Sequence, residues 1–307
     1  MESENNLKNF PVFIVGMPRS GTTILSNLLN ATQNIYFPPE THYYQLIKKF
    51  YSKKSKNPYL DFINLTRNKY FSEFKFSDYE IDNLKNLIIN YPKSQISSEL
   101  LKKICISKSL EKNIKRWGEK TPIHFYFLNK IFSDFQDCKV INVIRDPRDV
   151  IASNRSAKWR RIFDLHRKLV QYKNNYKYCH SYPETKVLNI KYEDLVSKPN
   201  VILKKVCKFL EINYNPKIID TFYKKKYLNF DVQNEPWKVN NLKPLTTKNI
   251  YKWKKQQFTF ENKYISWFCR REIRLYNYEK NVFPPIYICI FFQAYITLKS
   301  FLLNFRL

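Results

Sequence analysis

The fold is decided by the stretch Val12-Phe13-Ile14-Val15-Gly16-Met17-Pro18-Arg19-Ser20-Gly21-Thr22-Thr23. Its first four residues are apolar and mostly β-branched, which predicts a buried parallel strand. The nine residues 22–30 predict a helix, because their apolar side chains share one face: Ile24, Leu25, Leu28 and Leu29. A strand, a glycine-containing loop and a helix in this order form the context of a phosphate-binding loop.

The loop itself has the composition that an anion requires. Gly16 and Gly21 are two of only three glycines in the chain, and glycine lets the backbone turn several N–H groups toward one anion. The N-terminus of the next helix adds a partial positive charge. We therefore assign the anion to one continuous set of residues: Pro18, Arg19, Ser20, Gly21, Thr22 and Thr23. The alternative is an ordinary turn between strand and helix.

One position separates this loop from that of nucleotide triphosphatases. Thr22 stands where the Gly-x4-Gly-Lys-Ser/Thr pattern has its lysine. That lysine serves a γ-phosphate, so its replacement favours a ligand without one. The guanidinium of Arg19 suits a fixed anion better than a metal-bridged triphosphate. The loop thus predicts a fixed anionic ligand rather than a metal-bridged triphosphate.

Further along, apolar strands alternate with helices. Strands are expected at 140–144 and 187–190, and helices from 149 onward and at 159–180, 201–210 and 260–278. This alternation predicts an α/β protein of the P-loop type with three layers, in which a central parallel sheet is flanked by helices on both faces. We expect one domain over 10–280, with a helical insert at 43–116 that shapes the acceptor side.

Charge and cysteine content limit the class of protein. The net charge is +28, from 54 Lys and Arg against 26 Asp and Glu. The lysines are spread along the chain, which favours a coding bias over a specific nucleic-acid partner, although a basic protein attracts any anionic ligand. Six scattered cysteines without a CxxC pair argue against structural zinc and for reduced thiols. With no signal peptide in the sequence, we expect a cytoplasmic protein.

The segment 281–307 is an apolar, aromatic C-terminal tail. A transmembrane helix needs about 20 apolar residues with few charges, and this tail is borderline because Gln293 and Lys299 interrupt it. A packed helix or a helix on a membrane surface is favoured over a spanning one. The second of these would make the protein peripheral to a membrane.

Four segments, in order, resemble a known family. They are Pro18 to Thr23, Val143-Ile144-Arg145-Asp146-Pro147-Arg148-Asp149 with Ser153, Lys191-Tyr192-Glu193-Asp194-Leu195 with Pro199, and Leu275-Tyr276-Asn277-Tyr278-Glu279. The set resembles the sulfotransferases that use 3′-phosphoadenosine 5′-phosphosulfate (PAPS), in the branch of protein-tyrosine sulfotransferases and many bacterial enzymes. Asn277 replaces the glycine of the last segment. The resemblance covers residues 10–280 and implies PAPS as co-substrate and no metal.

The resemblance assigns the 3′-phosphate of the donor to Arg145 and Ser153. Arg145 follows a predicted strand, where open α/β sheets bind ligands, and its planar fork can hold a phosphate with two hydrogen bonds. Tyr192 matches a tyrosine that contacts the donor nucleotide, and its alternative role is a core tyrosine at a strand end. Arg148 and Asp149 are expected to form a structural ion pair. Ala157 stands where the tyrosine-sulfotransferase pattern has another arginine, and Arg155 and Lys158 are candidates to replace it.

Sulfuryl transfer needs a base for the acceptor and a cation for the leaving group. The resemblance implies Glu40, held in a proline-rich loop, as the catalytic base, and His42 is the rival base. It implies Lys120 as the cation on the bridging oxygen, with Arg19 assisting at the sulfate. The segment around Lys120, Trp117-Gly118-Glu119-Lys120-Thr121-Pro122, resembles the lysine-containing turn of the family. Where the pattern has a catalytic serine this chain has Tyr251, so Thr247 is a candidate substitute and both roles stay open.

The expected activity is therefore transfer of a sulfuryl group from PAPS to a hydroxyl or amine. Two alternatives stay open: a P-loop phosphotransferase, and a non-catalytic basic protein that binds nucleic acid or anionic lipid. The sequence does not identify the acceptor, which could be a carbohydrate, a lipid, a small alcohol or a peptide tyrosine. It does not give the oligomeric state either.

Overall fold

The computed structural model describes most of the chain. The described residues are 10–66, 76–90, 95–110, 114, 116–156, 164–225, 245–255, 259–279 and 284–304. The predicted positions Ala157 and Lys158, and the side chain of Arg155, lie outside this set.

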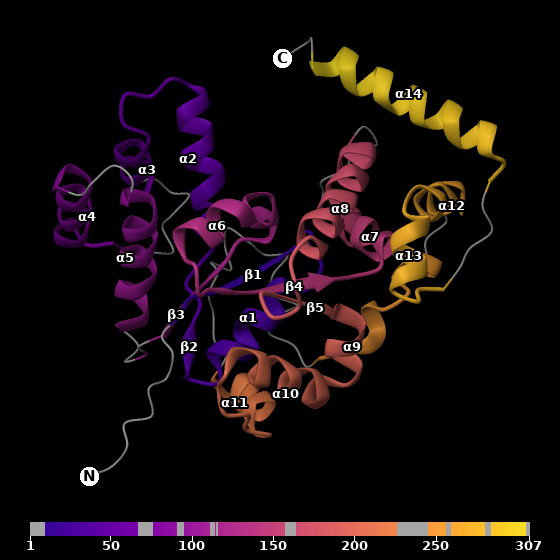
Figure 1. Ribbon diagram of the computed structural model, residues 1–307. Coiled ribbons are helices and arrows are strands. Elements are labelled where there is room, and N and C mark those ends of the chain that lie inside the picture. Colours follow the sequence, from indigo (N-terminus) through magenta and orange to yellow (C-terminus); the bar gives the residue numbers. More distant parts are fainter. Residues whose placement is uncertain are drawn as a thin grey trace.

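A five-stranded sheet forms the centre of the protein (Figure 1). Its strands are β1 Val12–Gly16, β2 Ile35–Tyr36, β3 Arg116–Lys120, β4 Lys139–Ile144 and β5 Val187–Lys191. The order is β2-β3-β1-β4-β5, and every neighbouring pair is parallel. The predicted α/β class with a parallel central sheet is confirmed. Because β1 lies between β3 and β4, the loop that follows β1 leaves the sheet between the ends of those strands.

Helices cover both faces of the sheet. Phe13 and Val15 belong to one buried cluster, and Val12 and Ile14 to the other, because successive side chains of a strand point to opposite faces. On the face of Val12 and Ile14 lie α1 Thr22–Asn30, α9 Tyr192–Ser197, α10 Pro199–Leu210 and α11 Ile218–Lys225. On the other face lie α6 Leu128–Asp134, α7 Pro147–Ser156, α8 Asp164–His180, α12 Thr259–Phe268 and α13 Arg270–Leu275. These are the three predicted layers.

The predicted helices between 43 and 116 are present and stand beside the β2–β3 edge of the sheet (Figure 1). They are α2 Tyr43–Ser52, α3 Pro58–Thr66, α4 Asp78–Asn90 and α5 Ile96–Leu110. Residue 116, however, begins β3, so the turn expected around Lys120 is in fact a strand.

All five residues of β3 are buried although three are charged. Arg116 has hydrogen-bond partners inside the protein for two of its three guanidinium nitrogens: Nε donates to Phe10 O at 3.0 Å and Nη1 to Leu210 O at 2.7 Å. The guanidinium also lies over the Phe10 ring, 3.9 Å from its centroid. The strand can be buried because its polar side chains find partners in distant segments. It therefore lacks the apolar pattern by which a buried strand is usually recognised.

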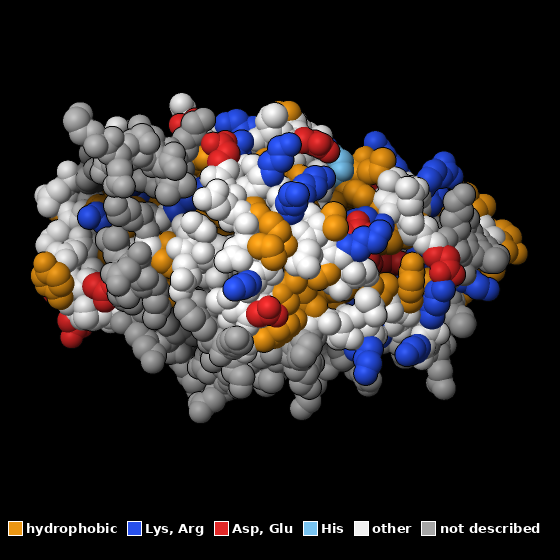
Figure 2. Space-filling model, turned by 90° about the horizontal axis from the view of Figure 1, so that it is seen from below, with side chains coloured by type: hydrophobic (Ala, Val, Ile, Leu, Met, Phe, Trp, Pro, Cys, Tyr) orange, Lys and Arg blue, Asp and Glu red, His pale blue; other side chains and the backbone are white. Residues whose placement is uncertain are grey.

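Two further differences concern the C-terminal third. The single helix expected at 260–278 is broken at Cys269 into α12 and α13. The tail forms α14 Ile286–Asn304. Among the described helices, none combines the length and apolar content needed to cross a membrane. Figure 2 shows Lys and Arg side chains scattered over one face of the molecule, with apolar side chains between them.

Candidate active site

The loop after β1 adopts the turn that its glycines allow. Gly16 has φ 153° and Gly21 φ 103°, and Arg19 between them has φ 75°. A Cβ atom on Gly16 would lie 2.5 Å from Val143 O, so this position needs glycine for space as well as for its backbone angle. Helix α1 starts at Thr22, directly behind the turn. Strand, loop and helix therefore meet as the sequence predicted.

Arg145 and Ser153 lie against the loop, on the side of β4. Arg19 Nε donates to Ser153 Oγ at 3.2 Å, and Arg145 Nη1 donates to Arg19 O at 2.9 Å. Arg145 Nε and Ser20 Oγ are buried and have no hydrogen-bond partner among the described residues. Buried donors without partners cost free energy, and phosphate oxygens would satisfy both. The residues present fit a nucleotide with phosphate groups at this loop.

Tyr192 closes this group from the end of β5. Its ring stacks against Arg145, whose Cζ lies 4.4 Å from the ring centroid. A Cβ atom on Gly21 would lie 2.5 Å from Cδ2 of Tyr192, so the ring touches the loop directly. Burial raises the pKa of the Tyr192 phenol. The Tyr192 ring also belongs to a buried apolar cluster. The two alternatives for Tyr192, a core tyrosine and a residue beside the phosphate loop, are therefore both met by one position.

Glu40 and Lys120 form an ion pair on the other side of the loop. Lys120 Nζ lies 2.5 Å from Glu40 Oε1 and donates to Thr23 Oγ1 at 3.3 Å. The Lys120 side chain is fully buried, whereas Glu40 retains 15% of its exposure. Charged hydrogen bonds of this kind are among the stronger ones in proteins. A carboxylate with limited solvent access and an ammonium group thus meet at the phosphate loop.

His42, the rival base, lies in the same cluster. Gln45 Nε2 donates to His42 Nδ1 at 2.7 Å, which leaves the proton of the neutral ring on Nε2, 3.7 Å from Glu40 Oε2. Burial lowers the pKa of His42, an effect that the nearby Glu40 partly offsets. The neutral ring is therefore favoured, and Glu40 lies between an ammonium and an imidazole N–H.

Sequence reasoning missed a buried network around Glu119. This carboxylate is fully buried and accepts hydrogen bonds from Thr41 Oγ1 at 2.9 Å, Thr121 Oγ1 at 2.6 Å and His124 Nδ1 at 2.8 Å. Burial alone would raise the pKa of Glu119, but His124 and the hydroxyl donors lower it. The network joins the residue after Glu40 to the residue after Lys120. In the sequence, the one indication of this network was that Thr41 follows Glu40 and that Glu119 and Thr121 flank Lys120.

The expected ion pair of Arg148 with Asp149 is wrong. Arg148 instead pairs with Asp146, with Nε–Oδ1 at 2.9 Å and Nη2–Oδ2 at 2.7 Å. Asp149 accepts the backbone N–H groups of Tyr251 at 2.8 Å and Trp253 at 3.0 Å. The reason is that the helix start turns Asp149 toward Arg145 Nη2, at 4.0 Å, and toward residues 245–255, here called the late loop, where two N–H donors satisfy it.

The late loop is therefore fixed over the Arg145 side of the site. Arg145 Nη2 donates to Asn249 O at 2.7 Å. Thr247 begins the short 3-10 helix η4 Thr247–Asn249, and the Tyr251 side chain is 43% exposed. These positions assign no chemical role to Thr247 or Tyr251.

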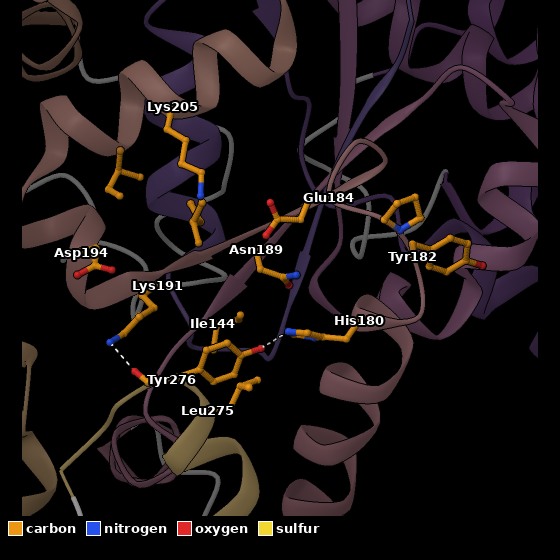
Figure 3. Close-up of a pocket in the computed structure, with 13 residues that line it drawn as sticks. Ile144, His180, Tyr182, Glu184, Asn189, Lys191, Asp194, Lys205, Leu275 and Tyr276 are labelled. Atoms are coloured by element: carbon orange, nitrogen blue, oxygen red, sulfur yellow. Dashed lines mark hydrogen bonds between the residues drawn. The ribbon is translucent and has the colours of Figure 1, made fainter.

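A separate pocket of about 600 Å³ lies at the open edge of β5 (Figure 3). Lys191, Lys205 and Tyr276 are among its lining residues, and Tyr276 OH hydrogen-bonds to His180 Nε2 at 2.9 Å. None of the predicted site residues lines it. Across the described residues, no group of three or more His, Cys, Asp or Glu is arranged to hold a metal ion.

Comparison with solved structures gives the fold independently. A sulfotransferase domain of the Synechococcus PCC 7002 olefin synthase matches with a TM-score of 0.61 at 18% identity, covering 88% of this chain and 95% of that one. The sulfotransferase domain from the curacin biosynthetic pathway matches with 0.61 at 19%, covering 89% and 99%. Mouse sulfotransferase SULT7A1, solved in complex with PAP, matches with 0.50 at 13%, covering 87% and 86%.

Sequence comparison is consistent with this. An uncharacterized protein of Aquifex aeolicus (strain VF5) is 21% identical over 266 residues, which is 83% of this chain. The chain spans 31% of the length of that relative. A family model described as the sulfotransferase family matches residues 11–216. That range contains the phosphate loop, Glu40, Lys120, Arg145 and Tyr192, and it is more than half of the chain: the protein belongs to the sulfotransferase family.

Proposed function

We propose that this protein transfers a sulfuryl group from PAPS to an acceptor hydroxyl or amine. One observation carries the proposal: the ammonium of Lys120 contacts both Thr23 of the phosphate loop and the carboxylate of Glu40. A cation for the leaving group and a base for the acceptor therefore lie next to each other at an anion-binding loop, which is the arrangement that displacement at sulfur needs.

The donor would lie across the loop and the end of β4. Residues 18–23 would hold the 5′-phosphosulfate through backbone N–H groups and the hydroxyls of Thr22 and Thr23. Arg145 and Ser153 would hold the 3′-phosphate, with Arg19 between the two phosphate sites. Tyr192 would contact the nucleotide beside Arg145. The hydrogen bonds that already join Arg19, Arg145 and Ser153 support this placement.

The transfer step then assigns a role to each remaining group. Glu40 takes the proton of the acceptor O–H as the acceptor oxygen bonds to sulfur in line with the bridging oxygen. The bond between sulfur and the bridging oxygen breaks, and its electron pair stays on the 5′-phosphate of the product. Lys120 stabilises that growing negative charge, and Arg19 assists at the sulfate. His42, with its N–H toward Glu40 Oε2, orients the carboxylate.

The two alternative functions are not favoured. A phosphotransferase of this fold would need a group in place of the loop lysine that Thr22 replaces. A purely binding protein would have no use for a buried Glu40–Lys120 pair, because burying an ion pair costs desolvation energy. Helices α2 to α5 stand on the side of β3, and we propose that they shape the acceptor site.

The test is transfer of radioactive sulfur from labelled PAPS to a panel of carbohydrate, lipid, small-alcohol and peptide-tyrosine acceptors. We expect transfer to at least one class, undiminished by EDTA, and its loss in Glu40→Gln. The matched control is Glu184→Gln, which neutralises a carboxylate at the β5 pocket instead. Magnesium-dependent transfer of phosphate from ATP, with no sulfur transfer to any acceptor, would refute the proposal.

A further inference from the structure

Helix α14 packs on the protein through one face only. Cys289 is fully buried, and the Phe292 ring lies 5.1 Å from that of Phe260 and 4.9 Å from that of Tyr264, centroid to centroid. The helix also contacts α8. Figure 1 shows α14 as the outermost helix at this end of the molecule, beyond α8 and α12. Its opposite face is thus turned away from the body.

That opposite face is apolar and exposed. We define the outer face of α14 by five large side chains and their exposed fractions: Ile286 64%, Tyr287 61%, Ile290 56%, Phe291 75% and Leu298 61%. The spacing from Tyr287 to Phe291 to Leu298 places them along one stripe of the helix. Single exposed apolar residues are ordinary, but a continuous row of large ones marks a surface that binds something apolar.

Helix α14 and the helices that it packs against carry more positive than negative charge. Within α14 the sequence contains no Asp or Glu, and Lys299 is its single charged residue. Helix α8, which α14 contacts, carries four basic residues against one Asp, and α12, on which Phe292 packs, carries one Lys and one Glu. The helices that α14 packs against therefore carry a net positive charge. Anionic lipid headgroups complement such a surface.

We propose that the outer face of α14 binds the surface of an anionic lipid membrane and lies in the plane of its headgroups. A second copy of this chain fits the same face poorly, because two chains of net charge +28 repel each other. No described helix is built to cross a bilayer, which is consistent with a helix that lies on its surface. The apolar side chains enter the acyl boundary while basic residues of the neighbouring helices meet the headgroups.

Vesicle flotation tests the proposal with the full chain. We expect the protein to float with phosphatidylcholine vesicles containing phosphatidylglycerol, and to bind pure phosphatidylcholine vesicles and high-salt samples much less. Phe291→Ser/Leu298→Ser should weaken binding by about tenfold or more, since two buried side chains are lost from the interface. The matched control is Tyr79→Ser/Ile89→Ser, two changes at side chains of α4 that are 76% and 70% exposed, which should bind like the wild type.

A second measurement locates the contact. All six cysteines are buried, so Leu298→Cys can be labelled with a polarity-sensitive fluorophore, and its emission should shift to the blue on anionic vesicles while label at Ile89→Cys stays unchanged. Failure of the wild type to float, or equal flotation of Phe291→Ser/Leu298→Ser, would overturn the proposal. So would a wild-type dimer that becomes a monomer in this variant without any vesicle binding.

Discussion

At the scale of single residues, the site is organised around Lys120. Its ammonium is fully buried, and its described partners are Glu40 Oε1 and Thr23 Oγ1. Because Lys120 contacts both the phosphate loop and the Glu40 carboxylate, this one side chain sets the distance between the proposed base and the proposed donor site. His42 Nε2 lies 3.7 Å from Oε2, the other oxygen of the Glu40 carboxylate. Because Lys120, Thr23, Glu40 and His42 lie in one cluster, we expect their contributions to the proposed catalysis not to be additive.

Replacing each candidate base, Glu40 or His42, with glutamine distinguishes their roles. Glu40→Gln should lower kcat by about 100-fold or more, because a general base contributes 10²–10⁴-fold, with unchanged affinity for 3′-phosphoadenosine 5′-phosphate. His42→Gln should lower kcat by about tenfold or less, because it removes only an orienting N–H. Steady-state kinetics with an identified acceptor measures both. The reverse pattern, with His42→Gln the more damaging change, would make His42 the base.

The sequence named Glu40, His42, Lys120 and Thr23 as candidates, but it did not show the contacts that hold them together. Glu40 and Lys120 were found through the segments around them. The Glu119 network was not, since its hydroxyl and imidazole donors come from Thr41, 78 positions away, and from Thr121 and His124. The expected partner of Arg148 was Asp149, but its true partner is Asp146, two residues before it. Asp149 lies 4.0 Å from Arg145 Nη2 and accepts two backbone N–H groups of the late loop, which no side-chain pattern encodes.

At the scale of elements, all three glycines of the chain lie where two segments approach closely. Gly16 faces Val143 O, Gly21 faces the Tyr192 ring, and a Cβ atom on Gly118 would lie 2.2 Å from Cε1 of Phe37. The contact between Gly118 and Phe37 affects how close Glu40 comes to Lys120, because Phe37 leads into the Glu40 loop and Gly118 precedes Lys120 on β3. Ring and strand must touch for the ion pair to form.

Filling that space should therefore damage both stability and activity. Gly118→Ala is expected to lower the free energy of unfolding by about 1–3 kcal/mol, the usual cost of overpacking a core, and to reduce transfer by displacing Glu40 from Lys120. Urea unfolding and the transfer assay measure the two effects. Gly118→Ala/Phe37→Leu should recover part of both, because the smaller side chain makes room for the new methyl group. A single variant as stable and active as the wild type would contradict this account of β3.

Apolar patterning explains which strands could be predicted. β1, β4 and β5 are apolar and were expected, whereas β3 reads Arg-Trp-Gly-Glu-Lys and was interpreted as a turn. Its charged side chains form hydrogen bonds with Phe10 O, Leu210 O, Thr41 and Glu40, all of them outside the strand. β2 has two residues, too few to show any period. A strand whose buried side chains are polar and paired is hard to recognise by hydrophobic patterning, because it lacks the apolar residues that such patterning detects.

At the scale of the whole molecule, histidine titration links stability to pH. Burial lowers the pKa of His42, His166 and His180 below the ordinary value of 6.5. The unfolded chain therefore binds more protons than the folded one just below pH 6.5, so the free energy of unfolding should fall as the pH drops from 7.5 to about 5.5. Urea unfolding across this range measures the slope. His166→Asn/His180→Asn should flatten it, and a slope of the opposite sign would contradict the prediction.

The measurement that tests the central claim most directly is calorimetric titration with 3′-phosphoadenosine 5′-phosphate in the absence of magnesium. We expect tight binding that Arg145→Ala weakens by about tenfold to a hundredfold, the range for losing hydrogen bonds to a charged group. Arg274→Ala, an exposed arginine on α13, should bind like the wild type, and ATP should bind weakly. No binding of the bisphosphate, or a magnesium-dependent preference for ATP, would contradict the assignment of a PAPS site to this loop.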